Sequence, residues 1–261
     1  MDTLATSDDG DTIRRQPYIQ QTWEMCRSFL SALKFIIYDA GRDPKYLDNH
    51  LLSYLSQDFI QSVMAMPLLI NEGVHNICRR EMRFILEMSV KTCYIQQKQY
   101  NSDVLTKLNE FRFILNSTNI SIQKQLNLTL IPDSNQTGFF EEVGRFYGES
   151  SNYVHLSQSQ ISERIALMQQ GRTSGKESPE EIETLNAFIA RILACSLVLL
   201  FHSVPSYVAG DFLVEANGES HDWFFAGSKL IAMIDEHFDY KHERQHDLPQ
   251  IRSKRLKRVS F

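Results

Sequence analysis

Apolar residues recur at helical spacing through most of the chain. Phe29, Leu33 and Ile36, for example, lie three or four positions apart, which places them on one face of a helix. Applied along the whole chain, this pattern predicts helices over residues 17–39, 46–64, 72–99, 102–115, 137–148, 154–170, 179–204, 206–216 and 220–238. We expect Pro17 to open the first helix and Pro67 to follow the end of the second.

The clearest helix start lies at Ser178. This serine can cap a helix, Pro179 fits the first turn, and Glu181 completes a capping box. The apolar residues 187–204 that follow contain Arg191, and the run is shorter than the roughly 20 residues that span a membrane. We therefore predict a buried central helix and no transmembrane segment.

Residues 116–137 fit no single element. They are rich in Asn, Gln, Ser and Thr, and residues 126–131 could form a short strand. The whole chain has only 11 Gly and 7 Pro among 261 residues, which favours long helices and few turns. The predicted fold class is all-α, a multi-helix bundle forming a single large domain over residues 17–240, after a disordered segment 1–16.

Charge divides the chain unevenly. Residues 241–261 hold seven Lys or Arg against two acidic residues, so this part carries +5, while the whole chain carries −5. The remaining residues therefore carry −10, which is untypical of a DNA-coating protein. The predicted basic C-terminal tail could grip phosphates through Arg252, Lys254, Arg255, Lys257 and Arg258. It could equally act as a nuclear localisation signal, contact an anionic membrane or remain a solvated end.

Several functional classes lack their motifs. The chain has no P-loop, no dinucleotide-binding glycine pattern, no H-E-x-x-H and no G-x-S-x-G, so we expect no cofactor. Asp235, His237, Asp239 and His242 lie close in sequence, but a solvated helix end explains them better than a metal site. Four cysteines without a close pair, and no apolar leader in residues 1–15, favour buried reduced thiols in a cytoplasmic protein.

Two places could carry chemistry. Arg80, Arg83 and Glu87 are spaced three and four apart, so they share a helix face that is either solvated or turned into a cleft. His155 stands among aromatic and small polar residues, and an imidazole that titrates near neutrality suits general acid–base work. A structural hydrogen bond is the alternative role for His155.

Residues 79–91 and 150–157 together resemble HEPN-type helical proteins. The resemblance covers about residues 72–170, the HEPN-like centre of the predicted domain. Many members of that superfamily are metal-independent ribonucleases of toxin–antitoxin, phage-defence or CRISPR systems, and they typically dimerise so that two Arg-x4-6-His motifs face one cleft. In this chain the nearest arginine before His155 is Arg145, with nine residues between the two, so the motif arginine is not matched.

The resemblance implies an RNA-directed protein that works as a homodimer in a defence or toxin-like setting. As a metal-independent endoribonuclease, it would use His155 as acid or base and Arg145, or Arg80 and Arg83, to clamp phosphate. Glu87 would orient His155 or an arginine.

In such a ribonuclease, Asn152 and Tyr153 would position the nucleotide. The alternative function is a non-catalytic helical module that binds a protein partner, which the missing motif arginine and the absence of other catalytic signatures favour.

Overall fold

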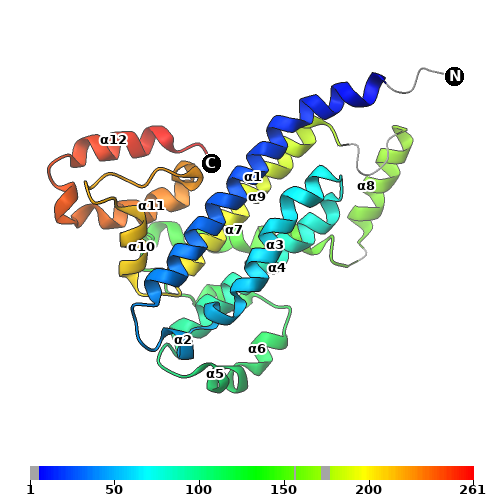
Figure 1. Ribbon diagram of the computed structural model, residues 1–261. Helices are drawn as coiled ribbons and strands as arrows, with labels where there is room; N and C mark the ends of the chain where they lie inside the picture. Colours follow the sequence, from blue (N-terminus) through cyan, green and yellow to red (C-terminus); the bar gives the residue numbers. More distant parts are fainter. Residues whose placement is uncertain (1–5, 156, 172–176) are drawn as a thin grey trace.

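The computed structural model describes residues 6–155, 157–171 and 177–261 of the chain (Figure 1). Within these ranges it is all-helical, and its only strand-like pairing is an isolated bridge between Val214 and Ser220. The helices are α1 (Thr6–Ala40), α2 (Tyr46–Asn49), α3 (Leu51–Asn71), α4 (His75–Lys98), α5 (Val104–Glu110), α6 (Arg112–Asn116), η1 (Ser121–Gln125), α7 (Asp133–Ser151), α8 (Gln158–Gln169), α9 (Pro179–Phe201), α10 (Ser206–Leu213), η2 (Phe224–Gly227), α11 (Lys229–His237), η3 (Phe238–Tyr240), η4 (His242–Arg244) and α12 (Leu248–Arg258). The predicted all-α fold class is confirmed.

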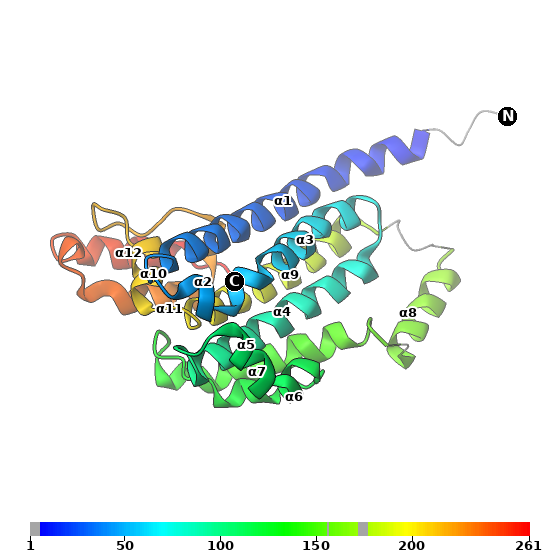
Figure 2. The ribbon, with the colours of Figure 1, turned by 60° about the horizontal axis from the view of Figure 1, so that its bottom comes forward.

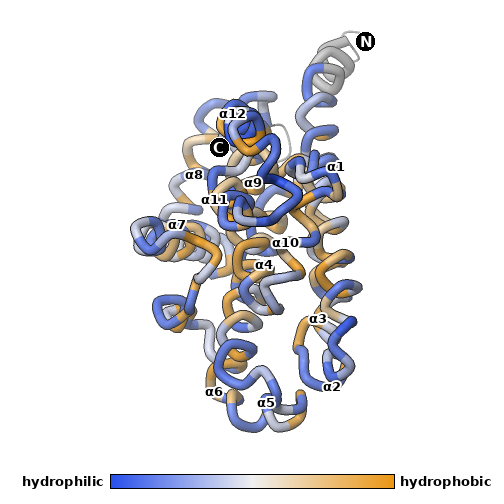
Figure 3. Tube along the Cα trace, turned by 90° about the vertical axis from the view of Figure 1, so that its left-hand side faces the viewer, coloured by the Kyte–Doolittle hydropathy of each residue, from blue (hydrophilic) through white to orange (hydrophobic). Residues whose placement is uncertain are grey.

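Helix α9 forms the centre of the molecule. It packs against α1 and α4, which in turn pack against α3, and these four helices run side by side in Figures 1 and 2. Every residue from Ile192 to Phe201 is buried. In Figure 3 the hydrophobic stretches lie along the helices of the bundle, whereas the connecting loops are mainly hydrophilic. The predicted buried central helix is therefore confirmed.

The start of α9 follows the predicted capping box. The Ser178 hydroxyl accepts a hydrogen bond from the Glu181 amide at 3.3 Å, and the Glu181 carboxylate accepts one from the Ser178 amide at 2.6 Å. Among the described residues, α9 is the one helix long and apolar enough to cross a membrane, and 78% of its most apolar stretch is buried inside the molecule.

Two predicted boundaries at prolines are wrong. Helix α1 begins at Thr6 rather than at Pro17, so residues 6–16 of the predicted disordered segment are helical. Helix α3 continues through Pro67 to Asn71. A proline inside a helix removes one hydrogen bond but keeps a helical φ. At Pro67 the loss is offset because the proline and its neighbours Met66 and Ile70 are buried in the core.

Residues 126–131 form no strand. Leu126, Leu128 and Leu130 do alternate into the core, as a strand would place them. However, the backbone amides of this segment donate to side chains instead of to a neighbouring strand. The Asn127 amide donates to Gln97 Oε1 at 2.8 Å, and the Leu130 amide donates to His202 Nε2 at 3.0 Å.

Two buried lysines fix the segment between α4 and α7 to the bundle. The Lys91 ammonium donates to the Leu115 and Ser117 carbonyls, at 3.0 and 2.7 Å, near the end of α6. Lys107 is fully buried, donates to the Asn49 carbonyl at the end of α2, and has a pKa lowered by burial to about 8. Each cation thus satisfies carbonyls that a helix end leaves unpaired.

Two buried histidines join loops to helix ends in their neutral form. His50 lies 2.8 Å from the Ser203 carbonyl through Nε2, and its Nδ1 accepts from the Leu52 amide. His202 Nδ1 lies 2.7 Å from the Val198 carbonyl. Burial lowers the pKa of both histidines to about 4.

Folding stability should therefore fall on acidification. Because an unfolded histidine has a pKa near 6.5, the unfolded chain binds more protons than the native one between pH 6.5 and 4. We expect each histidine to remove about 2 kcal/mol between pH 7.5 and 5. Urea unfolding of His202→Gln should give a lower stability at pH 7.5 but a flatter pH dependence. Parallel pH curves for the variant and the wild type would contradict this.

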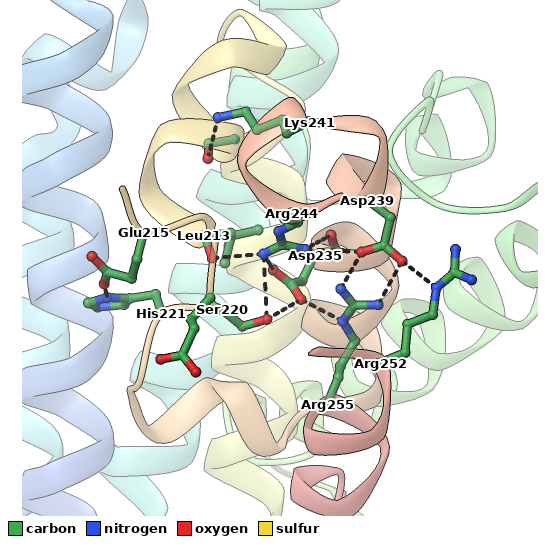
Figure 4. A network of polar contacts seen from close by, with 12 residues as sticks. Leu213, Glu215, Ser220, His221, Asp235, Asp239, Lys241, Arg244, Arg252 and Arg255 are labelled. Carbon is green, nitrogen blue, oxygen red and sulfur yellow. Dashed lines mark hydrogen bonds and ion pairs between the residues drawn. The ribbon is translucent and has the colours of Figure 1, made fainter. Parts of the chain in front are cut away.

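The C-terminal residues are folded, which corrects the prediction of a separate basic tail. Asp235 and Asp239 lie between the guanidinium groups of Arg244 and Arg255 (Figure 4). Arg244 is fully buried and reaches Asp235 at 2.6 Å; Arg255 reaches each aspartate at 2.5 Å. Arg252 adds a 2.9 Å contact to Asp239. This aspartate–arginine network fixes α12 against α11.

Asp235 and Asp239 form ion pairs with arginines instead of grouping as metal ligands. Burial alone would raise the pKa of Asp239, but hydrogen bonds from Arg255 and Arg252 outweigh it and lower that pKa. Lys254 pairs with Glu219, and Arg258 lies 3.6 Å from Asp222. Of the five predicted phosphate-gripping residues, Arg255 is thus buried and three others face carboxylates.

We expect Arg244→Met to lower the free energy of unfolding by about 3–5 kcal/mol, because it leaves the two buried carboxylates of Asp235 and Asp239 with only one buried guanidinium group, that of Arg255. The matched control is Lys254→Met, which removes an exposed ion pair and should cost less than about 1 kcal/mol. Thermal and urea unfolding of both variants measures the difference. Equal losses would show that the network contributes no more than a surface pair.

Candidate functional site

An open cavity of about 400 Å³ lies where α4, α7 and α9 meet the start of α8. Three of the predicted site residues line it: Arg145 near the end of α7, and Asn152 and Tyr153 in the turn that follows. We call this cavity the arginine groove; it is lined by Arg79, Arg145, Phe146, Glu149, Asn152, Tyr153, Ser159, Thr184, Leu185, Ala187, Phe188 and Arg191.

The three lining arginines lie over aromatic rings. The guanidinium carbons of Arg145 and Arg191 are 4.5 and 5.1 Å from the centre of the Phe146 ring. The guanidinium carbon of Arg79 lies 4.6 Å from the centre of the Tyr153 ring. Such stacking holds the planar groups in defined positions while their N–H groups stay available to a ligand.

The charges of the groove are only partly balanced. Arg145 pairs with Glu149 at 3.3 Å, and Arg191 pairs with Glu142 at 2.5 Å. In the part of the chain that the structure describes, no carboxylate pairs with Arg79, whose side chain donates to Asn76 Oδ1 at 3.4 Å. The lining thus carries three arginines and one glutamate in a chain of net charge −5, which suits an anionic ligand.

A second cavity of about 290 Å³ continues the groove along α8, and Arg79 and Thr184 line both. Its chemistry is mixed, because Glu163 and Arg164 of α8 face His75 of α4 across it. His75 is buried and lies 3.4 Å from Glu177; its pKa is lowered by burial. Both cavities have the size of ordinary small-ligand sites.

Arg80 and Arg79 hold Tyr153 from two sides. Arg80 donates to the Tyr153 carbonyl at 2.5 Å, and the Tyr153 hydroxyl donates to Glu163 at 3.2 Å. Burial raises the pKa of Tyr153, although Arg79 opposes that shift. Arg80 therefore fixes the turn that carries two groove residues and does not itself line the cavity.

Arg83 and Glu87 belong to a different cluster. Arg83 donates to the Tyr147 hydroxyl at 2.8 Å, and Glu87 accepts from Lys91 at 2.6 Å. The Tyr147 hydroxyl also lies 3.3 Å from Glu87 and contacts the Thr118 carbonyl. These contacts pin the 117–118 loop to α4 and α7, and neither Arg83 nor Glu87 lines the arginine groove.

His155 stands apart from both groups. It is exposed in the turn between α7 and α8, and the groove lining does not include it. Among the described contacts, none joins the His155 side chain to Glu87 or to an arginine. The predicted catalytic residues His155, Arg145 and Glu87 are therefore not brought together.

Other reactive groups are occupied or buried. The four cysteines are free and buried, as predicted, and burial raises the pKa of Cys26 to about 12. Within the described ranges, no three His, Cys, Asp or Glu side chains are grouped to hold a metal ion.

The sequence prediction missed Arg79 and Arg191 as groove residues. Arg191 did carry a signal, because it is the only charged residue among residues 187–201. A lone charge in an otherwise apolar buried helix marks a point where the helix reaches the surface. Arg79 had no such signal, since several charged residues surround it in the sequence.

Comparison with protein-family models, with curated proteins and with solved structures finds no match to this chain.

The two tyrosine hydroxyls should differ in their contribution to stability. We expect Tyr147→Phe to lower the free energy of unfolding by about 1–3 kcal/mol, because buried Arg83 loses its hydroxyl acceptor. Tyr153→Phe removes a hydroxyl bonded to exposed Glu163 and should cost less than about 0.5 kcal/mol. Urea unfolding of both variants tests this, and an equal cost would refute the assignment of Tyr147 to a structural cluster.

Proposed function

We propose that this protein binds single-stranded RNA at the arginine groove and does not cleave it. The observation that carries the proposal is the set of Arg79, Arg145 and Arg191, stacked on aromatic rings around one cavity. Guanidinium groups held in this way can bind phosphate oxygens in pairs and can stack on bases.

Two observations favour RNA over other phosphate-bearing ligands. Residues 79–91 and 150–157, which resemble HEPN proteins, supply Arg79, Asn152 and Tyr153 to the groove. The groove is also open, so a ligand that continues beyond it can enter. Unstacked bases in single strands can reach aromatic and arginine side chains, whereas bases within a duplex cannot.

Binding fits the geometry better than cleavage does. Metal-free cleavage needs an acid or base beside the group that stabilises the phosphate. Here His155 does not line the groove, and Glu87 is bonded to Lys91 in another cluster. The missing motif arginine before His155 agrees with this reading.

We expect Arg79→Gln to weaken binding of a short single-stranded RNA about ten-fold, because it removes a charge-assisted contact to phosphate. The slope of log K against log salt should shrink by about 0.7. Fluorescence anisotropy at several salt concentrations measures both quantities. Lys257→Gln, an exposed basic residue on α12, is the control that should change neither. A loss of affinity confined to the Lys257 variant would move the site to α12.

Incubation of the labelled RNA with wild-type protein in EDTA should leave it intact, and His155→Ala should bind RNA as wild type does. Cleavage by the wild type that the His155 variant loses would overturn the non-catalytic proposal and restore the ribonuclease reading.

A further inference from the structure

The second cavity differs in charge from the arginine groove that it adjoins. It has a volume of about 290 Å³ and lies between α8 and the starts of α4 and α9. Arg79 and Thr184 line both cavities, so one ligand can reach from the groove into the second cavity. The groove is lined by three arginines and one glutamate, whereas the second cavity is lined by two arginines and three glutamates.

This change in charge separates the places where the parts of a nucleotide can bind. Phosphate is stabilised by the guanidinium groups of the groove and is repelled by the carboxylates of the second cavity. A base is uncharged, and its N–H groups can donate to carboxylates. The nucleotide whose phosphate lies in the groove can therefore place its base in the second cavity.

Two adjacent residues of α8, Glu163 and Arg164, are available to such a base. The Tyr153 hydroxyl donates to Glu163 Oε2 at 3.2 Å and so holds the carboxylate in place, while Oε1 accepts no hydrogen bond from the residues that the structure describes. Arg164 forms no hydrogen bond or ion pair with any described residue. Both side chains line the cavity, so their hydrogen-bonding atoms are free for a ligand.

The other two carboxylates of the cavity are already bonded. Glu177 lies 3.4 Å from His75 Nδ1, and Glu181 accepts from the Ser178 amide at 2.6 Å in the capping box. Glu163 is therefore the carboxylate that we assign to the ligand.

We propose that the second cavity binds a guanine base of the RNA, with Glu163 accepting from N1–H and the N2 amine and Arg164 donating to O6 and N7. The Watson–Crick edge of guanine carries two adjacent donors, which the two oxygens of one carboxylate can accept. An arginine binds O6 and N7 as a pair. This inference rests on the proposed RNA binding and adds the base that the site selects.

The other bases match this pair of side chains less well. Adenine and cytosine present one amine beside an unprotonated ring nitrogen, and uracil presents one N–H between two carbonyls. Each of them would set an acceptor atom against the carboxylate of Glu163. Ala166 and Leu167 add an apolar wall against which a flat base can pack, but this contact does not distinguish one base from another.

Fluorescence anisotropy with short oligouridines that carry a single guanosine, adenosine or inosine tests the base. The wild type should bind the guanosine oligonucleotide about ten-fold more tightly than the adenosine one. Inosine lacks only the N2 amine of guanosine, so its oligonucleotide should bind about five-fold less tightly than that of guanosine. In Glu163→Gln the three oligonucleotides should bind within about two-fold of one another.

Glu183→Gln is the matched control. Glu183 is an exposed residue of α9 that precedes Thr184 and lines neither cavity, so this variant removes the same charge without changing the contacts to the base. It should keep the full preference for guanosine. Circular dichroism should show the same helicity in the wild type and in both variants.

Arg79→Gln separates this inference from the RNA proposal, because it removes a phosphate contact and leaves Glu163 in place. It should weaken all three oligonucleotides alike and keep their order. If Arg79→Gln weakens binding but the wild type binds the three equally, RNA binding stands and the guanine inference is wrong. A guanosine preference that survives Glu163→Gln would also overturn the inference. If the wild type binds none of them, both proposals are wrong.

Discussion

Burial of α9 is the constraint that the other helices satisfy. From Ile192 to Phe201 this helix has no exposed face, so apolar surface must surround it on all sides. Helices α1 and α4 supply most of that surface, and α11, α7 and α10 add to it. This cover is incomplete at Arg191, directly before that stretch, where the side chain is 43% exposed. The arginine groove lies at that point, so its position follows from how the core is enclosed.

Buried cations help to hold the connections between these helices in place. Lys91 and Lys107 bind backbone carbonyls at helix ends, and Arg244 and Arg255 lie against two aspartates. A buried cation is costly unless its donors are satisfied, so each of these side chains accepts few arrangements of its loop. Such contacts therefore fix the positions of the loops rather than add net stability.

The sequence predicted the helices because helical periodicity is local, and the Ser178 capping box located the start of α9. It misassigned the basic C-terminal residues because Arg255 meets aspartates 16 and 20 positions away, a pairing that only the packing of α11 and α12 creates. For the same reason, the sequence predicted only some of the residues that line the groove. Asn152 and Tyr153 are neighbours in sequence, whereas Arg79 and Arg191 meet only after α4 packs on α9.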